Sequence, residues 1–408
     1  MKKLIVLVLI LLPLLTACQK SLNVTVSNTL ATDRNNEMVE MSLEQISKKL
    51  TLNEGESFIV ENEKGEEIPY QITHDQKVIF QATVKAEGTA SFCIHRGTPQ
   101  TYATKACGKI YPERMDDLAW ENDVIGARAY GPALQKRGER GFGYDLFAKR
   151  GTTEPVLEDM YKKECNKESW AKFRELNKTD RKAAQEWRRA ITYHCDRGHG
   201  MDCYAVGPTL GAGIAALLNG EEIVYPWCYD KCEILDNGPL RFTARLVFTP
   251  LTYKESEVIE TRVISLDAGS HMNRTHISYK GLNESAPIVS GIVLHAGSDN
   301  YKLNTEKGFI TYQDPTTGPD QGELYLGHVH PETVKDTRAA YFSEEESKTR
   351  NNAKGHVLAE NVYNPATGFL YYWGFGWNRG DVKDYATWNA YIADFAERIK
   401  APLVVSFN

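Results

Sequence analysis

The feature that most limits the possible folds is a long series of short segments in which apolar and polar residues alternate. In 242–249, Phe242, Ala244, Leu246 and Phe248 alternate with mostly polar neighbours, which places the apolar set on one face of a strand. Similar runs follow at 258–264, 276–279, 288–294, 308–312, 323–329 and 357–361. Because no helical pattern separates these runs, we expect antiparallel sheets rather than βαβ units.

The segment before residue 110 also consists of short predicted strands. They cover 23–28, 57–60, 68–72, 77–84 and 89–94, with Gly55, Gly65 and Gly88 between them. Several strands at this spacing are typical of a small antiparallel sandwich. The chain is therefore predicted to be mainly β, with a small N-terminal β-sandwich (18–110) and a large antiparallel β-supersandwich (111–408) that carries a few peripheral helices.

Two segments have the helical rather than the strand period. The segment 157–193 is highly charged and contains neither Gly nor Pro, and its apolar residues recur every three or four positions. We expect a helical insertion there, a pair of solvated helices on one side of a sheet, with a break and candidate N-caps at 177–180. A final helix begins near Asp384 and ends before Pro402, with a stripe formed by Trp388, Tyr391, Ile392, Phe395 and Ile399.

The first residues have the pattern of a secretion signal. Lys2 and Lys3 precede a twelve-residue apolar run that only Pro13 interrupts, too short for a transmembrane helix. Leu-Thr-Ala-Cys at 15–18 resembles a bacterial lipobox, in which Cys18 takes the lipid; the alternative is a plain signal peptide with an incidental Cys. We expect a signal peptide at 1–17 and a mature protein that is attached to the membrane only by its lipid. The segment after Cys18 lacks an acidic run, which favours a Gram-negative outer membrane and its periplasmic side.

The charge of the chain restricts its partners. The 408 residues include 48 Lys and Arg against 54 Asp and Glu, a formal charge of −6. Loss of Lys2 and Lys3 with the signal would leave 46 basic side chains and a charge of about −8. Such acidity argues against a nucleic-acid partner and repels an anionic glycan at long range. A site for an acidic sugar must therefore be a local basic pocket.

Seven cysteines remain beyond Cys18, and an exported protein may form disulfides. They are Cys93, Cys107, Cys165, Cys195, Cys203, Cys228 and Cys232. The odd number leaves at least one free thiol if all pairing is internal, and Cys93–Cys107 and Cys228–Cys232 are plausible pairs. The absence of any CxxC pair argues against a zinc site, and we expect neither a metal nor another cofactor.

The densest polar cluster in the sequence lies at 193–204. His194, His199, Asp196, Asp202 and Tyr204 fall within twelve residues, and three glycines follow. Histidine is the natural base near neutral pH, and a Gly-flanked loop can direct several side chains to one point. The alternative is a turn whose Asp and His side chains satisfy only local backbone groups.

A second candidate follows Trp-Glu-Asn-Asp at 120–123. Arg128 and Tyr130 lie two residues apart in a predicted strand and therefore share a face. Arginine on a strand can clamp a carboxylate with two parallel hydrogen bonds. The structural alternative is an ion pair of Arg128 with Glu121, Asp123 or Asp145.

Further candidate sugar ligands lie in the C-terminal half. His328 and His330 share a strand face, and two histidines at this spacing are a weak indication of a metal site. His271 or His356 could supply the third ligand of such a site. We favour instead one histidine that faces the substrate and one that is structural. Asn273, in the polar segment that begins at Gly269, is a further candidate ligand of the sugar.

Glycines alternate with aromatic residues in 373–381, which could leave a ring face open for a sugar. The alternative is that these aromatic rings pack against the final helix. We expect Trp373 and Trp377 to divide these roles, with Trp377 the more exposed.

Three sequence blocks resemble a known family. They are Val-Ser-Asn-Thr-Leu with the acidic residues after it (26–40), Trp-Glu-Asn-Asp to Tyr-Gly-Pro-Ala-Leu (120–134), and Gly-His-Gly-Met-Asp-Cys-Tyr-Ala-Val-Gly-Pro-Thr-Leu-Gly-Ala-Gly (198–213). The chain resembles a domain-of-unknown-function family of Bacteroidota lipoproteins encoded in polysaccharide-utilisation loci. The resemblance implies a galactose-mutarotase-like supersandwich, and one branch is linked to dehydration of uronate-ended oligosaccharides. Cys165, Cys195 and Cys203 are additions of this sequence.

We therefore expect an enzyme that acts on uronate-containing oligosaccharides by β-elimination, as a dehydratase or lyase. It would use His194 or His199 as base, Tyr204 as acid and Arg128 as carboxylate clamp. The substrate-binding residues would be Tyr130, Asp202, His271, Asn273, His328 and Trp377. The alternatives are a glycoside hydrolase, with Asp202 and either Asp196 or Glu121 as its carboxylates, and a non-catalytic glycan-binding lipoprotein.

Overall fold

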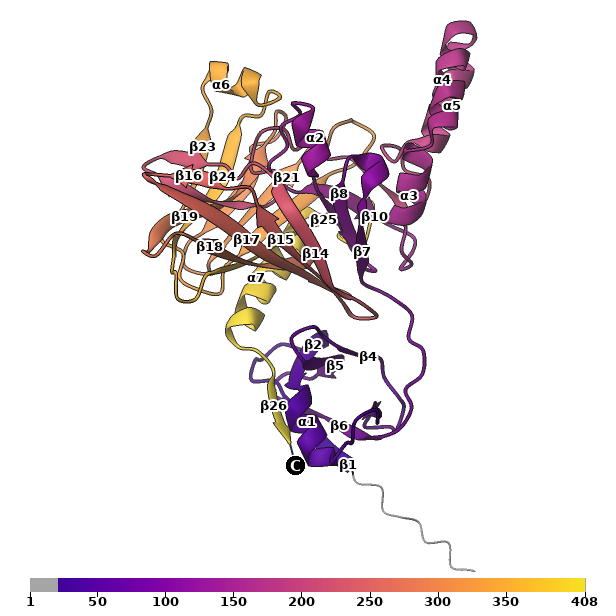
Figure 1. Ribbon diagram of the computed structural model, residues 1–408, viewed down its shortest axis with the longest axis vertical. Coiled ribbons are helices and arrows are strands. Elements are labelled where there is room, and N and C mark those ends of the chain that lie inside the picture. The colour runs from indigo at the N-terminus through magenta and orange to yellow at the C-terminus, as the bar shows by residue number, and fades with distance from the viewer. Residues whose placement is uncertain (1–20, 408) are drawn as a thin grey trace, which may run out of the picture.

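The computed structural model describes residues 21–407, so the expected signal peptide and Cys18 lie outside the described residues. The protein is mainly β, and every pair of named strands in 21–407 is antiparallel, as the sequence predicted. Figure 1 shows a smaller body at one end of the molecule, a larger β body, and a helical hairpin that projects from the larger body.

Two small sheets form the N-terminal body around one apolar core. One contains, in order, β26 (Val404–Phe407), β1 (Ser21–Ser27), β6 (Thr89–Arg96) and β3 (Phe58–Asn62); the other contains β2 (Arg34–Ser42), β5 (Lys77–Val84) and β4 (Tyr70–Ile72). The helix α1 (Leu43–Leu50) follows β2, and Ser42 caps it. Val26, Phe80 and Ile94 are fully buried between the sheets. The five strands predicted here are present, whereas β2 and α1 were not predicted.

The last strand connects the two ends of the chain. Val405 in β26 lies opposite Val26 in β1, so the C-terminus completes the N-terminal sheet (Figure 1). The division of the chain at residue 110 stays a prediction.

The larger body consists of two extended sheets packed face to face. One has the order β14 (Tyr229–Asn237), β15 (Arg241–Phe248), β17 (Ser256–Asp267), β18 (Met272–Lys280), β25 (Phe369–Trp377), β22 (Leu324–Val329), β21 (Phe309–Asp314) and β20 (Tyr301–Asn304), with β16 (Leu251–Tyr253) paired to β17. The other has the order β13 (Glu222–Val224), β12 (Ala215–Asn219), β19 (Ala286–Leu294), β24 (Gly355–Tyr363) and β23 (Asp336–Tyr341). The predicted fold class, with its sandwich of antiparallel sheets, is confirmed.

A third sheet of the larger body positions the candidate site. Its order is β11 (Gly200–Asp202), β10 (Asp145–Lys149), β9 (Ile125–Ala129), β8 (Asp117–Glu121) and β7 (Cys107–Tyr111). One face, with Trp120 and Leu146, packs on the main core. The opposite face carries charged residues under α3 (Leu157–Glu164), whose Met160 and Tyr161 are fully buried. Charged side chains are thus held between a sheet and a helix.

The predicted helical insertion contains three helices rather than two. After α3 come α4 (Lys167–Thr179) and α5 (Arg181–Ile191), and Asp180 caps α5 by accepting from the backbone of Lys182 and Ala183. The break predicted at 177–180 is therefore confirmed. Only α3 covers the sheet, because α4 and α5 pack on each other and project from the body (Figure 1).

The predicted C-terminal helix is α7 (Tyr385–Lys400), capped by Asp384 as expected. It covers the outer face of the nine-stranded sheet, where Trp388 and Ile392 are fully buried. The remaining short helices are η1 (Pro112–Arg114), α2 (Pro132–Lys136) and α6 (Glu344–Thr349). Within 21–407, no helix is both long and apolar enough to span a membrane.

All seven described cysteines are free thiols. The predicted pairs Cys93–Cys107 and Cys228–Cys232 are therefore wrong. Cys93 lies in β6 of the N-terminal sheet, whereas Cys107 begins β7 of the third sheet. Cys228 is buried, and its thiol lies 3.6 Å from the carbonyl oxygen of Tyr130.

Candidate functional site

Arg128 is the centre of a buried charged cluster on the third sheet. It lies opposite Asp145 in the neighbouring strand, and its guanidinium donates to the carboxylates of Asp145 and Asp202, the latter at 3.0 Å. A third carboxylate, Asp117, lies 3.7 Å from the same group. The structural alternative foreseen for Arg128, an ion pair with Asp145, is therefore the observed one. Arg128 is unable to act as the predicted substrate clamp because it is 2% exposed and both terminal nitrogens of its guanidinium already donate to neighbouring side chains.

The cluster is enclosed by tyrosines. Tyr130 donates its hydroxyl to Asp145 at 2.6 Å, and the Tyr193 hydroxyl accepts from Arg128 at 2.9 Å and from Arg114 at 3.1 Å. The predicted common face of Arg128 and Tyr130 is confirmed. Tyr130 therefore belongs to the cluster, where it holds a carboxylate.

Burial makes the cluster energetically costly. Arg128 is 2% exposed, and the carboxylates of Asp117 and Asp202 are fully enclosed. Burial raises the pKa of Asp117 to about 6, and it raises the pKa of Asp202 to about 6 with help from the charge of Asp145. Three buried polar atoms of this region have no hydrogen-bond partner: Asp117 Oδ2, Arg128 Nε and Tyr161 Oη. Such a concentration of perturbed, incompletely satisfied groups is characteristic of functional sites.

His194 connects this cluster to the solvent. Its side chain is 46% exposed, and its Nδ1 lies 3.5 Å from Asp202 Oδ2 and 3.3 Å from the Asp202 carbonyl oxygen. A buried carboxylate that orients a half-exposed imidazole is the arrangement of a general base, with the second ring nitrogen open to a substrate. The structure therefore joins three predicted site residues, His194, Asp202 and Arg128.

His199 and Tyr204 lie apart from His194. His199 has charged neighbours in Arg197, Asp159 and Lys163, and burial together with the Arg197 charge lowers its pKa. Its Nε2 is buried without a hydrogen-bond partner. Tyr204 is 5% exposed, and its ring meets that of His295 edge to face. Burial raises the pKa of Tyr204 well above the usual value. Neither residue shares a described contact with the His194 ring.

The loop that contains His194 is held by Asp196. Its carboxylate accepts from the backbone of Gly198 at 2.8 Å and Gly200 at 3.1 Å, and it pairs with Arg150 at 2.6 Å. For Asp196 the local, structural reading is therefore correct. Glu121 is likewise occupied, because it pairs with Lys149 at 2.6 Å and accepts from the start of α3. Neither carboxylate can serve the hydrolase that the sequence left open.

Sequence reasoning missed a second imidazole–carboxylate pair beside Tyr204. His295 Nδ1 lies 2.6 Å from Asp314 Oδ2, and the Tyr204 ring centroid lies 5.5 Å from that of His295. Burial lowers the pKa of His295, but the charge and hydrogen bond of Asp314 outweigh it and raise that pKa. Because His295 directly follows β19 and Asp314 ends β21, no local spacing links the two in the sequence.

Trp377 and Trp373 are not an open sugar platform. Trp377 is 2% exposed and donates to the Gln321 carbonyl oxygen, and Trp373 is fully buried against Tyr144. The prediction that Trp377 is exposed is therefore wrong. The physical reason is that β25 lies inside the nine-stranded sheet and directs these rings into the core.

Two other predicted sugar ligands are also buried. His328 Nδ1 lies 3.0 Å from the Ser290 hydroxyl, which also contacts His330 at 3.1 Å, and burial lowers the pKa of His328 to about 4. The expected substrate-facing histidine is therefore absent from this pair. Asn273 is fully buried and accepts from Trp120 at 2.8 Å. These groups form polar links inside the sandwich and cannot reach a sugar.

Among residues 21–407, no group of three or more His, Cys, Asp or Glu side chains could hold a metal ion. The possible chelate of His328 and His330 with His271 or His356 is not formed. His356 is buried and accepts from the Leu210 backbone at 3.1 Å.

An open cleft of about 720 Å³ reaches the loop 192–199, which contains His194, through Gly198; His194 itself does not line it. It is lined by Asp123, Val124, Lys149, Arg150, Gly151, Thr152, Thr153, Gly198, Arg379, Gly380 and Asp381. Three of the segments highlighted in the sequence, 120–123, 193–204 and 373–381, therefore contribute to its walls, together with Val124 and 149–153. Gly151 and Gly198 have positive φ, and a side chain on Gly151 would lie 2.8 Å from the Gly198 carbonyl oxygen. Glycine is thus required where the two loops meet.

Three basic and two acidic side chains line this cleft. Lys149 is neutralised by Glu121, and Arg150 is paired with Asp196. Arg379 is exposed, and within the described part of the chain its guanidinium has neither an ion pair nor a side-chain hydrogen bond. A free arginine among exposed backbone groups is suited to bind a carboxylate. Arg379 was not predicted to have this role, because a guanidinium without a partner is visible only in three dimensions.

His271 lies behind the cleft. It is 8% exposed, its Nδ1 lies 2.8 Å from the Phe375 carbonyl oxygen, and its Nε2 lies 3.0 Å from Asp381. Burial raises the pKa of Asp381, but the hydrogen bond and charge of His271 outweigh it and leave that pKa lowered. His271 therefore positions an exposed carboxylate of the cleft.

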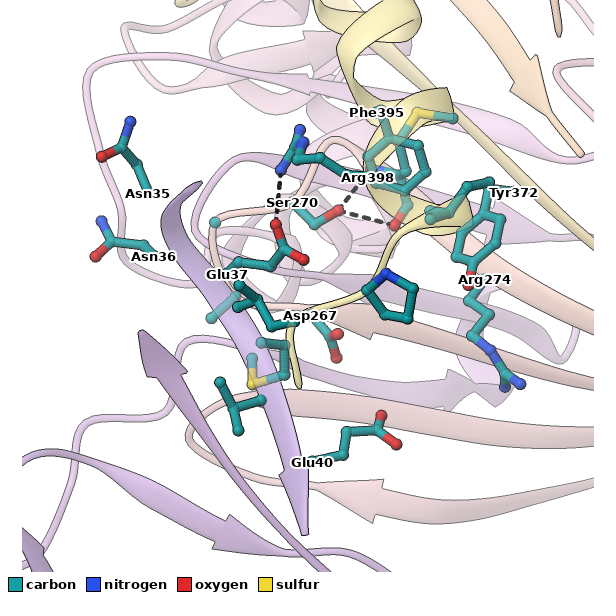
Figure 2. Close-up of a pocket in the computed structure, with 18 of the residues that line it drawn as sticks. Asn35, Asn36, Glu37, Glu40, Asp267, Ser270, Arg274, Tyr372, Phe395 and Arg398 are labelled. Atoms are coloured by element: carbon teal, nitrogen blue, oxygen red, sulfur yellow. Dashed lines mark hydrogen bonds and ion pairs between the residues drawn. The ribbon is translucent and has the colours of Figure 1, made fainter. Parts of the chain in front are cut away.

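A second cavity, of about 650 Å³, separates β2 from α7 and the outer face of the nine-stranded sheet. Figure 2 shows Asn35 and Asn36 at one side and Arg274 with Tyr372 at the other. Most of its charged groups pair with each other: Arg241 binds Glu40 and Asp267, and Arg398 contacts Glu37 and Asp394. These pairs connect the two bodies and leave few groups for a ligand, so the cleft lined by Gly198 and Arg379 is the better candidate site.

Three comparisons relate the chain to other proteins. The uncharacterized protein P7 of Formosa agariphila is 26% identical over 337 residues, which cover 81% of this chain and 78% of that protein. An α-mannosidase from Enterococcus faecalis V583 has a TM-score of 0.48 at 9% identity, and a glycosyl hydrolase family 38 protein from Enterococcus faecalis has the same TM-score at 8% identity. Each alignment covers 95% of this chain but only 46% and 47% of those chains, so the chain spans about half their length.

The family assignment agrees with the resemblance noted in the sequence to a family of unknown function. The match covers residues 26–405, which includes the His194 loop and all segments that line the cleft. The chain therefore belongs to the family DUF4861, described as a domain of unknown function.

Proposed function

We propose that this protein is an enzyme that acts on uronate-containing oligosaccharides by β-elimination, as a dehydratase or a lyase. The observation that carries the proposal is the half-exposed His194 held by the buried carboxylate of Asp202. The adjoining cleft supplies the free arginine that an acidic sugar requires, although the chain as a whole is acidic.

The chemistry of the reaction matches these groups. The C5 proton of a uronate lies next to a carboxylate and is only weakly acidic, so its removal needs a base and neutralisation of the growing negative charge. We assign His194 as the base that takes the C5 proton while the C4–C5 double bond forms and the C4–O bond breaks; the leaving oxygen takes up a proton from water, and Arg379 binds the carboxylate. Arg128 instead fixes Asp202, which orients His194.

An absorbance assay tests the proposal. Purified protein should generate the absorbance band of unsaturated uronates from oligosaccharide fragments of ulvan, pectin or glucuronan. Absence of a signal with all three would contradict it. Release of reducing sugar without new absorbance would instead select a glycoside hydrolase, for which Asp123 and Asp381 on the cleft are the available carboxylates. Non-catalytic binding is the weaker alternative, because its expected platform at Trp377 is buried.

Arg379 gives the first test of substrate charge. Replacement by alanine should raise KM for uronate oligosaccharides roughly 10- to 100-fold, since a charge-assisted hydrogen bond contributes about 1.5–3 kcal/mol. Unfolding by urea should be unchanged because Arg379 is exposed and unpaired. Lys383→Ala, which removes a nearby exposed cation, is the matched control. An equal change of KM in both variants would contradict a specific role for Arg379.

We further propose that the protein is anchored by lipid at Cys18, in a Gram-negative outer membrane and facing the periplasm. In cells fed labelled palmitate, the wild type and Cys93→Ser should both carry label, whereas Cys18→Ser should carry none and should leave the membrane fraction. Label that persists in Cys18→Ser would contradict the assignment.

A further inference from the structure

The helical hairpin α4–α5 has a charge opposite to that of the remaining chain. Residues 167–191 contain eight Lys and Arg against four Asp and Glu, a net charge of +4 in a chain of −6. Among residues 21–407, the one ion pair that involves this hairpin joins Lys178 to Glu175. Most of its positive charge is therefore free to meet a partner.

The free cations form a stripe along α5. Arg181, Lys182, Arg188 and Arg189 are all exposed and occupy positions i, i+1, i+7 and i+8, which lie on one face of a helix. Gln185, at i+4, lies between these cations, and Glu186 is the one acidic side chain of α5 at the edge of the stripe. It extends over about 12 Å, from the rise of 1.5 Å per residue.

The other side of α5 is occupied by α4. Trp187 donates to the Ser169 carbonyl oxygen at 2.9 Å, and the Lys172 ammonium lies 3.7 Å from the Trp187 ring centroid. The apolar surface of the hairpin is thus used internally. A partner of α5 must be recognised through the charges of the stripe.

Both ends of the insertion lead into the cleft. Before α3 the chain passes through 150–153, and after α5 it passes through Gly198, and all of these residues line the cleft. In Figure 1 the hairpin extends from the larger body, at the end of the molecule opposite β1. If Cys18, three residues before β1, is anchored in a membrane, the hairpin therefore lies at the end of the molecule distant from that membrane.

We infer that the basic stripe on α5 is an accessory binding surface for an anionic polysaccharide, which it holds beside the cleft. The choice of a polyuronate as occupant rests on the proposed function. Charge complementarity and the connection of the hairpin to the cleft support a polymer longer than the cleft can hold. A stripe that concentrates such a chain should accelerate capture of long substrates and have little effect on short ones.

A quadruple variant, Arg181→Gln, Lys182→Gln, Arg188→Gln and Arg189→Gln, tests the inference in the full chain. Glutamine is a good helix former, so the hairpin should remain folded. The matched control is Lys64→Gln, Lys231→Gln, Lys280→Gln and Lys302→Gln, which neutralises four exposed lysines without an ion pair elsewhere in the described chain. Both variants remove four positive charges, one from the hairpin and the other from surfaces elsewhere.

The first measurement is binding to immobilised polygalacturonate at two salt concentrations. The hairpin variant should bind about tenfold more weakly or worse, the control should bind as wild type, and added salt should reduce the difference. Equal weakening of both variants, or tighter binding of wild type to anionic lipid vesicles or duplex DNA than to polygalacturonate, would overturn the inference.

The second measurement separates the inference from the proposed reaction. Turnover of a short uronate oligosaccharide should be unchanged in the hairpin variant, whereas turnover of the polymer should fall. Hairpin-dependent polymer binding without any unsaturated product would refute the β-elimination but leave the binding surface in place.

Discussion

Replacement of His194 by alanine should lower kcat on uronate oligosaccharides by about 10²- to 10⁴-fold, the usual contribution of a general base. The free energy of unfolding should barely change, because the ring is half exposed and its polar contacts are confined to Asp202. Asp202→Asn should also slow turnover, since it removes the negative charge that lies 3.5 Å from the ring and stabilises the imidazole in its protonated form. Absorbance assays and urea unfolding of the same preparations separate the two effects.

The structure offers a matched control for this experiment. His74 lies 2.7 Å from the buried carboxylate of Asp236, so it repeats the exposed histidine and buried aspartate outside the cluster. His74→Ala should leave turnover at the wild-type level. If His194→Ala were equally active, the base would have to be sought elsewhere, first at His295 with Asp314.

The strands were predictable because alternation carries the information about which face is buried. The segment 242–249 coincides with β15, and its alternate residues Phe242, Ala244 and Leu246 are all fully buried. Helix caps were equally informative, since Asp180 and Asp384 do begin α5 and α7. The pairing of β26 with β1 had no local signal, because it joins the two ends of the chain.

The wrong prediction at Trp377 shows that a real pattern in the sequence can be given the wrong function. The order Trp-Gly-Phe-Gly-Trp at 373–377 itself has period two, which places three rings on one face of a strand. The glycines serve the opposite face, where a side chain on Gly374 would lie 1.9 Å from the His271 carbonyl oxygen. Close packing of the backbone, rather than access for a sugar, explains the glycines.

The cluster around Arg128 was only partly predictable. Arg128, Tyr130, His194 and Asp202 were selected for their chemistry, but the sequence could not show that antiparallel register places Asp145 opposite Arg128 and Asp202 one strand further. Because Arg128 donates to both of these carboxylates, it balances their charge and does not bind a substrate. For the same reason, the sequence could not identify Arg379 as the free arginine.

Replacement of Arg128 by methionine should cost about 3–5 kcal/mol of unfolding free energy, because it leaves three buried carboxylates without their counter-charge. Urea unfolding at neutral pH measures this loss. Arg128→Lys keeps the charge but loses the planar fork that holds Asp145 and Asp202 together, so it should be destabilised less than Arg128→Met. Equal stability of wild type and Arg128→Met would contradict a charge-balancing role.

The loss should also depend on pH in a defined direction. In the wild type the pKa of Asp117 is raised to about 6, so between about pH 4 and 6 the folded protein keeps a proton that the unfolded chain has released, and stability falls as pH rises through this window. Without Arg128, whose charge lowers the pKa of Asp117, this carboxyl group should hold its proton to still higher pH. The destabilisation by Arg128→Met should therefore be small at pH 5 and several-fold larger at pH 8. The single variant Asp117→Asn should lose less unfolding free energy than the wild type as pH rises from 4 to 6. A loss that is the same at pH 5 and pH 8 would mean that packing of the Arg128 side chain, rather than its charge, stabilises the cluster that positions His194.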